Sequence, residues 1–301
     1  MDQQHYYEQY WQHLRNLGLP EEMIDRYRQQ IAQSRHSSNH WATQVGLLAG
    51  NLKQFNQLMS GDDADLNDVE EAPLQVIIHP APAIEPALQW AVACGADVAF
   101  VNHYYLNDLS TGLSQEASRS QLSDWWDIHD AAALKEMLHW LQENGHRIEY
   151  DIIWQAINLV SIKESKAFLR EYIITNELEE AMIMERLRNT RAVKELFHKR
   201  KLAGENEAPD MLIWDMARMI NLSRIGYDAG YLSREQAVAN LLWGVPLLKR
   251  TYTSWKHLSL SYQFARCIWN GVELGSVETL LGNMDYLLMA ADSPWTRLSF
   301  Y

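Results

Sequence analysis

The chain has 301 residues, enough for one large or two modest domains, and its 47% apolar and 22% charged residues exclude bulk disorder. Its net charge of −13 makes nucleic acids and anionic membranes poor partners, because like charges repel. Residues 1–120 hold 15 acidic and 6 basic side chains, so the N-terminal part carries most of the excess.

The two cysteines and the apolar runs indicate the cellular compartment of the protein. Cys94 and Cys267 lie in apolar stretches without a second cysteine nearby, which is typical of buried thiols in a reducing compartment. The first twelve residues carry no secretory leader pattern. The longest near-apolar run, 241–248, is too short to span a bilayer. We therefore expect a cytoplasmic protein without membrane association.

Helix signals dominate the N-terminal part. Pro20, followed by two glutamates, is typical of a helix N-terminus, and Ser38 is placed to cap a helix that continues to Leu52. Residues 61–73 form an acidic, turn-rich stretch that predicts a surface loop. Residues 75–78 are the most strand-like run. A helix is expected over 85–94 and a second linker over 111–123.

Caps and breakers are sharper in the second half. The pattern predicts helices capped by Asp130, Ser233 and Ser254, beginning at Pro209 and Ser276, and ended by Gly145, Gly230 and Gly271. Ser233 and Gln236 have the spacing of a capping box. One long helical region is expected over 163–201.

These patterns predict an all-α fold. We expect an orthogonal multi-helix domain over 121–301, preceded by a smaller, variable helical N-terminal region with an acidic loop over 1–120. The short motifs of nucleotide-binding, zinc-protease and serine-hydrolase sites (GxxxxGK[ST], GxGxxG, HExxH and GxSxG) are absent from the sequence.

Asp215 and Arg218 are the first pair of residues that could carry out chemistry. They lie three residues apart on one predicted helix beside Trp214, within reach of each other. In a functional site, the guanidinium of Arg218 could bind an anion, and the carboxylate of Asp215 could orient that guanidinium or act as a general base. The commoner alternative, which we favour, is a buried structural ion pair in a Trp-rich core.

The segment 226–233 is the second candidate, with Tyr227 and Tyr231 beside glycines. The tyrosines could wall an aromatic pocket. We favour a helix–helix corner instead, with Gly230 in the left-handed conformation and the capping box directly after it.

Histidines and carboxylates between residues 103 and 147 form the third group: His103, Asp124, Asp127, His129, His139 and His146, with Arg147 beside them. No two of these histidines have the i, i+4 spacing of a helical metal site, so we predict no metal and no cofactor. His146 and Arg147 follow Gly145, where either side chain could bind the last carbonyls of the preceding helix.

The C-terminal clusters resemble a known family. The run Trp214-Asp-Met-Ala-Arg218 and the stretch from Asn221 to Ala237 are similar to a bacterial family known only as domain of unknown function 1266. Further agreement comes from Trp126-Asp-Ile128, Leu138 to Leu141, Gly145 to Arg147, Tyr252 to Trp255, and Ser293-Pro-Trp295. The resemblance covers about residues 121–301. It implies a bacterial protein with a helical C-terminal domain, and it supplies no activity. Ile225 stands where the family often has a second tryptophan.

Three classes of function remain open. The first, which we favour, is a non-catalytic protein-binding or regulatory module, possible roles including toxin neutralisation. Its contact with a basic protein partner would be made by six acidic residues: Asp62, Asp63, Asp65, Asp68, Glu70 and Glu71. The second is an enzyme with an unfamiliar helical site around Asp215, Arg218, Tyr227, Tyr231 and His146. The third is a structural or oligomer-forming component, and the oligomeric state is left open.

Overall fold

The computed structural model describes residues 75–176, 178–204, 209–272 and 274–301. These residues belong to one compact unit, and every regular element in them is a helix, which confirms the predicted all-α class. In chain order the helices are α4 (Pro86–Ala93), α5 (Ala96–Val101), α6 (Gln115–Trp126), α7 (Ala131–Glu143), α8 (Arg147–Ile157), α9 (Ile162–Asn176), α10 (Glu180–Lys199), α11 (Leu212–Asp228), α12 (Arg234–Trp243), α13 (Val245–Thr251), α14 (Trp255–Asn270), α15 (Leu274–Met289) and α16 (Pro294–Arg297).

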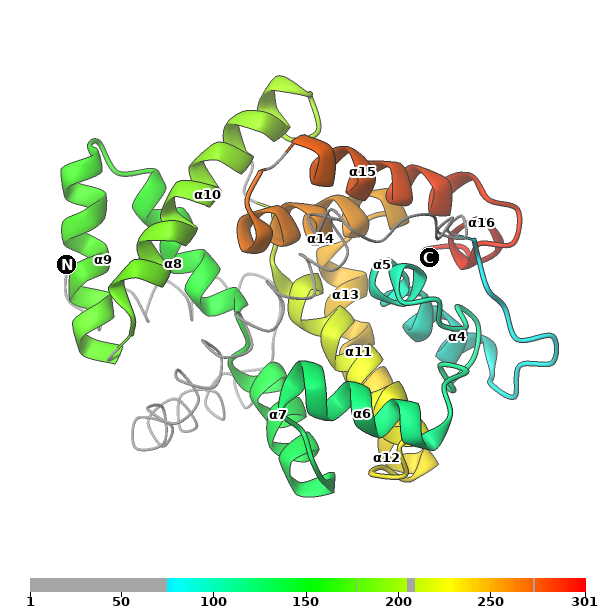
Figure 1. Cartoon of the computed structure of the whole chain (residues 1–301). Coiled ribbons are helices and arrows are strands. Elements are labelled where there is room, and N and C mark those ends of the chain that lie inside the picture. The colour runs from blue at the N-terminus through cyan, green and yellow to red at the C-terminus, as the bar shows by residue number, and fades with distance from the viewer. Residues whose placement is uncertain (1–74, 177, 205–208, 273) are drawn as a thin grey trace, which may run out of the picture. The chain divides into compact units, whose positions relative to one another are not determined.

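Helix α11 is the central element of this unit. Every side chain from Ile213 to Gly226 is buried, and a helix buried on all faces belongs to the core. It contacts α5, α6, α7, α8, α12 and α14, which surround it in Figure 1. The polar residues that α11 carries are therefore interior groups that need partners.

The first described helices and the chain's C-terminus are fastened to each other. The indole N–H of Trp90 in α4 donates to the carbonyl of Phe300 (3.1 Å), and that of Trp295 donates to Ala93 (2.9 Å). Trp255 stacks on Trp295 with ring centroids 6.1 Å apart. Since α6 also crosses the position between residues 120 and 121, residues 75–120 share a core with the segment that follows.

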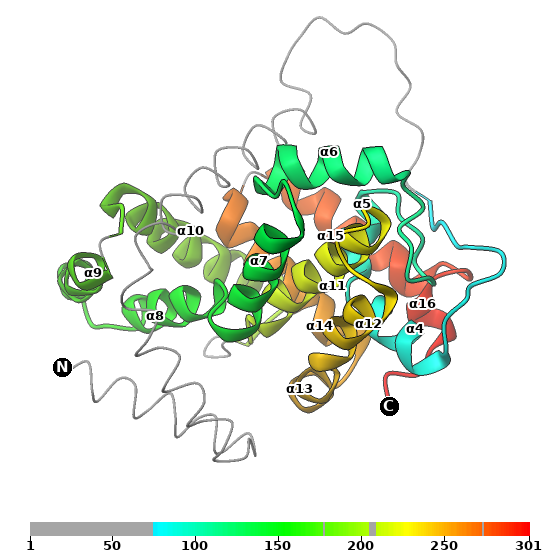
Figure 2. The ribbon, with the colours of Figure 1, turned by 90° about the horizontal axis from the view of Figure 1, so that it is seen from below.

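Helix α9 lies at one edge of the described structure, next to α8 and α10 (Figures 1 and 2). It buries Ser165, Leu169 and Ile173 against its neighbours. Aliphatic side chains at this edge remain open to solvent: Val160 is 95% exposed, and Ile174 is 77% exposed.

Most of the predicted helix ends are confirmed. Asp130, Ser233 and Ser254 accept hydrogen bonds from first-turn N–H groups, and Ser233 and Gln236 form the complete capping box. Gly145, Gly230 and Gly271 have φ values of 60°, 75° and 86°. These conformations suit glycine, since a Cβ is strained there.

The most strand-like run, residues 75–78, forms no strand. Four expectations are wrong. The helix expected to begin at Pro209 begins at Leu212. The expected linker 111–123 contains most of α6, which Ser114 caps. The expected helical region 163–201 is two helices, and the N–H of Leu178 returns to the carbonyl of Ile173 (3.0 Å), which closes α9. Helix α15 begins before Ser276. The helices expected near Pro20 and Ser38 and the loop 61–73 lie outside the described residues.

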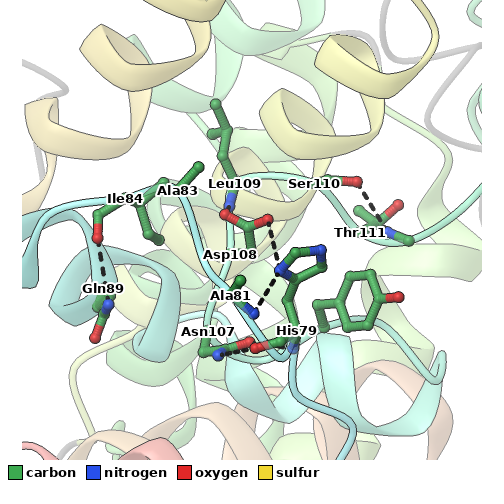
Figure 3. A network of polar contacts seen from close by, with 12 residues as sticks. His79, Ala81, Ala83, Ile84, Gln89, Asn107, Asp108, Leu109, Ser110 and Thr111 are labelled. Atoms are coloured by element: carbon green, nitrogen blue, oxygen red, sulfur yellow. Dashed lines mark hydrogen bonds and ion pairs between the residues drawn. The ribbon is translucent and has the colours of Figure 1, made fainter.

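A polar network joins the segment before α4 to the loop between α5 and α6 (Figure 3). The side chain of Asn107 exchanges two hydrogen bonds with the backbone of His79, at 2.6 and 2.9 Å. The buried guanidinium of Arg224 donates to three carbonyls of this loop, those of Tyr105, Leu109 and Ser110. In an irregular loop, carbonyl groups lack the backbone N–H partners that a helix or sheet would supply. The N–H groups of Arg224 therefore provide hydrogen bonds to these carbonyls.

None of the helices in the described ranges is long and apolar enough to cross a membrane.

Candidate functional site

Asp215 sits at the start of α8, although it belongs to the first turn of α11. Its side chain is fully buried, and its two oxygens accept the backbone N–H groups of His146 (2.9 Å) and Arg147 (3.0 Å). A carboxylate is favourable here because the first N–H groups of a helix lack intrahelical partners and the helix dipole is positive at this end. Asp215 thus caps a helix that lies 68 residues earlier in the chain.

Gly145 makes room for this contact. Its φ of 60° is left-handed, and a Cβ added to it would lie 2.0 Å from Oδ2 of Asp215. The same glycine ends α7, where its N–H binds the carbonyl of Trp140 (2.9 Å). The position therefore requires glycine both for its conformation and for the close approach of the carboxylate.

Arg147 completes the junction of α7, α8 and α11. Nη1 donates to Oδ2 of Asp215 (3.1 Å) and to the carbonyl of Leu141 (2.7 Å), while Nη2 donates to the carbonyl of Gln142 (2.7 Å). The expectation that Arg147 binds the last carbonyls of the preceding helix is confirmed. One guanidinium thus ties the end of α7 to the buried carboxylate of α11.

The environment keeps Asp215 charged and His146 neutral. Burial alone would raise the pKa of Asp215, but the contacts with His146 and the charge of Arg147 outweigh it and hold that pKa below its usual value. Burial chiefly lowers the pKa of His146 to about 4. Its imidazole packs edge-on against Trp140 and Trp269, with centroids 4.8 and 4.9 Å away, and its Nδ1 lies 3.5 Å from Oδ1 of Asp215.

Arg218 does not form the predicted ion pair with Asp215. Its guanidinium lies 3.3 Å from the ring centroid of Trp214 and 5.2 Å from that of Trp269, an arrangement stabilised by cation–π attraction. The i, i+3 spacing allowed the predicted contact, but Arg147 and the start of α8 take up the carboxylate. The expectation that both residues are buried in a Trp-rich core is confirmed, at 0% exposure for Asp215 and 7% for Arg218.

A second buried pair lies on the other side of Trp269. Arg186 of α10 forms an ion pair with Glu149 of α8, and its guanidinium lies 4.4 Å from the Trp269 ring. Trp269 is therefore in contact with two guanidinium groups, those of Arg186 and Arg218. The sequence pattern placed Arg186 on the exposed side of the long helical region 163–201, which is wrong, because Arg186 is buried. Glu149 was not singled out, since nothing local distinguishes either residue from the exposed charges on the same helices.

The tyrosines of the second candidate lie elsewhere. Tyr227 is twelve residues from Asp215 on the same helix, which is about 18 Å along its axis. Tyr231, beyond the helix end, donates to the carbonyl of His129 (2.7 Å), and the guanidinium carbon of Arg119 lies 5.5 Å from its ring centroid. The five candidate catalytic residues therefore do not converge on one place.

The remaining candidates make local contacts or fall outside the structure. The ring of His129 contacts Asp127 at 2.8 Å on the surface. Within the described ranges, no three potential metal ligands lie together. The six acidic residues from Asp62 to Glu71 lie outside the described residues, so their role as a binding segment stays a prediction.

A family model described as a protein of unknown function (DUF1266) matches residues 121–300. The chain belongs to this family. The matched region contains Gly145, Arg147, Asp215 and Arg218, so the whole α7–α8–α11 junction is part of the DUF1266 domain. Searches among curated proteins and among solved structures found no match.

The junction is chemically suited to holding helices together. Asp215 is ionised and already accepts three N–H groups, two from backbone and one from Arg147. A general base needs a lone pair within reach of a substrate proton, and this carboxylate is fully buried. We therefore interpret the junction of α7, α8 and α11 as a buried structural contact that holds these helices together.

Asp97 is an interior carboxyl group that sequence reasoning did not single out. It lies in α5, where it accepts the hydroxyl of Ser259 (2.9 Å) and the amide N–H of Gln263 (2.7 Å) on the same oxygen. Burial raises its pKa to about 7, opposed by these two hydrogen bonds and by the charge of Arg266. A lone acid within the apolar run 91–101 was the available clue.

Asp97 makes stability depend on pH. The folded protein keeps the Asp97 proton up to about pH 7, while the unfolded chain releases it near pH 4. The folded state then binds more protons in this window, so the contribution of Asp97 to stability falls as the pH rises from 4 to 7. In Asp97→Asn this fall is absent, a relative change of about 4 kcal/mol across the window.

Urea unfolding at several pH values checks this expectation. The exposed Asp285 of α15 provides the control, and Asp285→Asn should follow the wild-type pH profile. If the free energies of unfolding of Asp97→Asn and of the wild-type protein change in parallel from pH 4 to 7, Asp97 does not titrate as described.

Proposed function

We propose that this DUF1266 protein is a non-catalytic protein-binding module that recognises a basic partner. The observation that carries the proposal is the placement of the candidate catalytic groups. Asp215, Arg218 and His146 are buried among helices, and Tyr227 and Tyr231 lie at the far end of α11. An enzyme site built from these five residues would need them to converge on an accessible cleft.

The edge formed by α9 supports a role in binding. Val160, Ile162 and Ile174 are 95%, 60% and 77% exposed. Exposed aliphatic side chains on a helix edge are a frequent component of protein contacts. The acidic segment from Asp62 to Glu71 adds negative charge. Negative charge speeds association with a basic protein, and this effect weakens as the salt concentration rises.

A bacterial, cytoplasmic setting is part of the same proposal. Cys94 and Cys267 are both buried and unpaired with each other. Burial raises the pKa of the Cys267 thiol to about 12, so it is unreactive at neutral pH. Free, unreactive thiols are typical of proteins in reducing compartments.

Site-specific photocrosslinking tests the binding surface. A photoreactive residue replaces Ile174 in one variant and the exposed Glu136 of α7 in a matched control. We expect a discrete adduct with one basic protein from position 174 and none from position 136. Equal labelling from both positions, or no discrete adduct, would count against a binding surface at α9.

Binding of the purified partner then separates the two features. Ile174→Asp should speed dissociation, because it places a charge in the contact. Neutralising the six acids between Asp62 and Glu71 as amides should slow association several-fold at low salt. An unchanged dissociation rate would remove α9 from the interface, and an unchanged association rate would reduce the acidic segment to a solubility feature.

A further inference from the structure

Positive charge exceeds negative charge around Trp269. Arg147 and Arg186 are matched by Asp215 and Glu149, each in an ion pair. The guanidinium of Arg218 contacts Trp214 and Trp269. Burial, and then the nearby charge of Arg266, lower the pKa of Arg218. Neither Arg218 nor Arg266 forms an ion pair with a carboxylate of the described residues.

Several buried polar side-chain atoms at this place lack hydrogen-bond partners among the described residues, including Nδ1 of His146 and Nε of Arg266, and three of them are donors close to Trp214. They are Nη1 of Arg218, Nε1 of Trp214 and the hydroxyl of Tyr150, all buried. The three side chains are neighbours: Arg218 lies over Trp214, and the rings of Trp214 and Tyr150 are 6.4 Å apart. Arginine and indole N–H groups can only donate, so what satisfies them must accept.

The chemistry of these groups defines the missing acceptor. A buried, unpaired guanidinium is costly, and an anion removes that cost while a water molecule does not. The rings of Tyr262 and Trp269 pack against Trp214, with centroids 5.4 and 6.0 Å away, so we expect the acceptor to be a compact ion.

We propose that the DUF1266 domain binds a compact anion, a halide or a short carboxylate, between α8, α11 and α14, at the donors of Arg218, Trp214 and Tyr150. The ion stabilises the core and is held independently of any protein partner. Failure of this inference would therefore leave the proposed function untouched.

Thermal unfolding of the full chain at constant ionic strength tests the proposal. Sodium gluconate, whose anion is bulky, is replaced stepwise by chloride, bromide, formate or acetate. A bound ion should raise the unfolding temperature saturably, by several degrees. A rise with halides alone identifies a spherical ion, and a rise with formate and acetate identifies a carboxylate. No saturable rise with any of the four would overturn the proposal.

Two variants separate the site from general salt effects. Arg218→Met should abolish the saturable part, while Arg188→Met, at an exposed arginine of α10, should retain it. A saturable rise that persists in Arg218→Met would place the ion elsewhere.

Crystals of the wild-type protein grown in bromide give a readout that needs no variant to fold. We expect an anomalous peak within hydrogen-bond distance of Nη1 of Arg218. Bromide peaks confined to the surface would contradict the proposal.

Discussion

Replacing Asp215 by asparagine lowers the free energy of unfolding by about 3–5 kcal/mol. The substitution keeps the shape of the side chain but removes the charge that faces Arg147 and the start of α8. The guanidinium of Arg147 is then buried next to a neutral group. Chemical denaturation followed by tryptophan fluorescence measures the loss.

Asp292 offers a matched control for this substitution. It also forms an ion pair with an arginine, Arg297, but both side chains are more than half exposed. Exposed pairs contribute about 0–1 kcal/mol, so Asp292→Asn should leave stability nearly unchanged. Equal effects of the two substitutions would show that Asp215 is not an interior group.

Gly145→Ala destabilises the protein by about 4 kcal/mol, for two reasons that can be separated. A left-handed backbone costs a residue with a Cβ about 1–2 kcal/mol. The new Cβ also meets Oδ2 of Asp215 at 2.0 Å, so the carboxylate has to leave the N–H groups that it binds. Thermal and urea unfolding give the size of the loss.

Two other glycines isolate these contributions. Gly230 also follows a helix end with a φ of 75°, and an added Cβ would closely approach only the amide end of the flexible Gln115 side chain (2.7 Å), so Gly230→Ala reports mainly the backbone strain. Gly282 lies within α15, with open space around it, and Gly282→Ala should stabilise the helix by about 0.5–1 kcal/mol. If Gly145→Ala costs no more than Gly230→Ala, the close approach of Asp215 is refuted.

Helix ends could be predicted from the sequence because their chemistry is local. Asp130, Ser233 and Ser254 bind N–H groups two or three residues away, and Gly145 and Gly230 satisfy a backbone conformation. Such features need no knowledge of the remaining chain. The same reasoning predicted the class of fold.

The interior polar contacts could not be predicted in the same way. Asp215 caps a helix 68 residues away, and Arg224 binds a loop 115 residues away. The short spacing between Asp215 and Arg218 suggested a pair, but the tertiary arrangement offered Asp215 better partners. Burial of these residues was nevertheless predictable, because tryptophan and aliphatic residues surround them in the sequence.

Amide hydrogen exchange at the start of α8 tests most directly whether the buried carboxylate of Asp215 holds α8 and α11 together. First-turn N–H groups of a helix usually lack intrahelical partners and exchange readily. We expect the amides of His146 and Arg147 to exchange only through global unfolding in the wild-type protein, and to lose this protection in Asp215→Asn. The exposed first-turn amide of Arg234 in α12 provides the comparison. Exchange of the His146 and Arg147 amides as fast as that of Arg234 would contradict a structural role for the carboxylate.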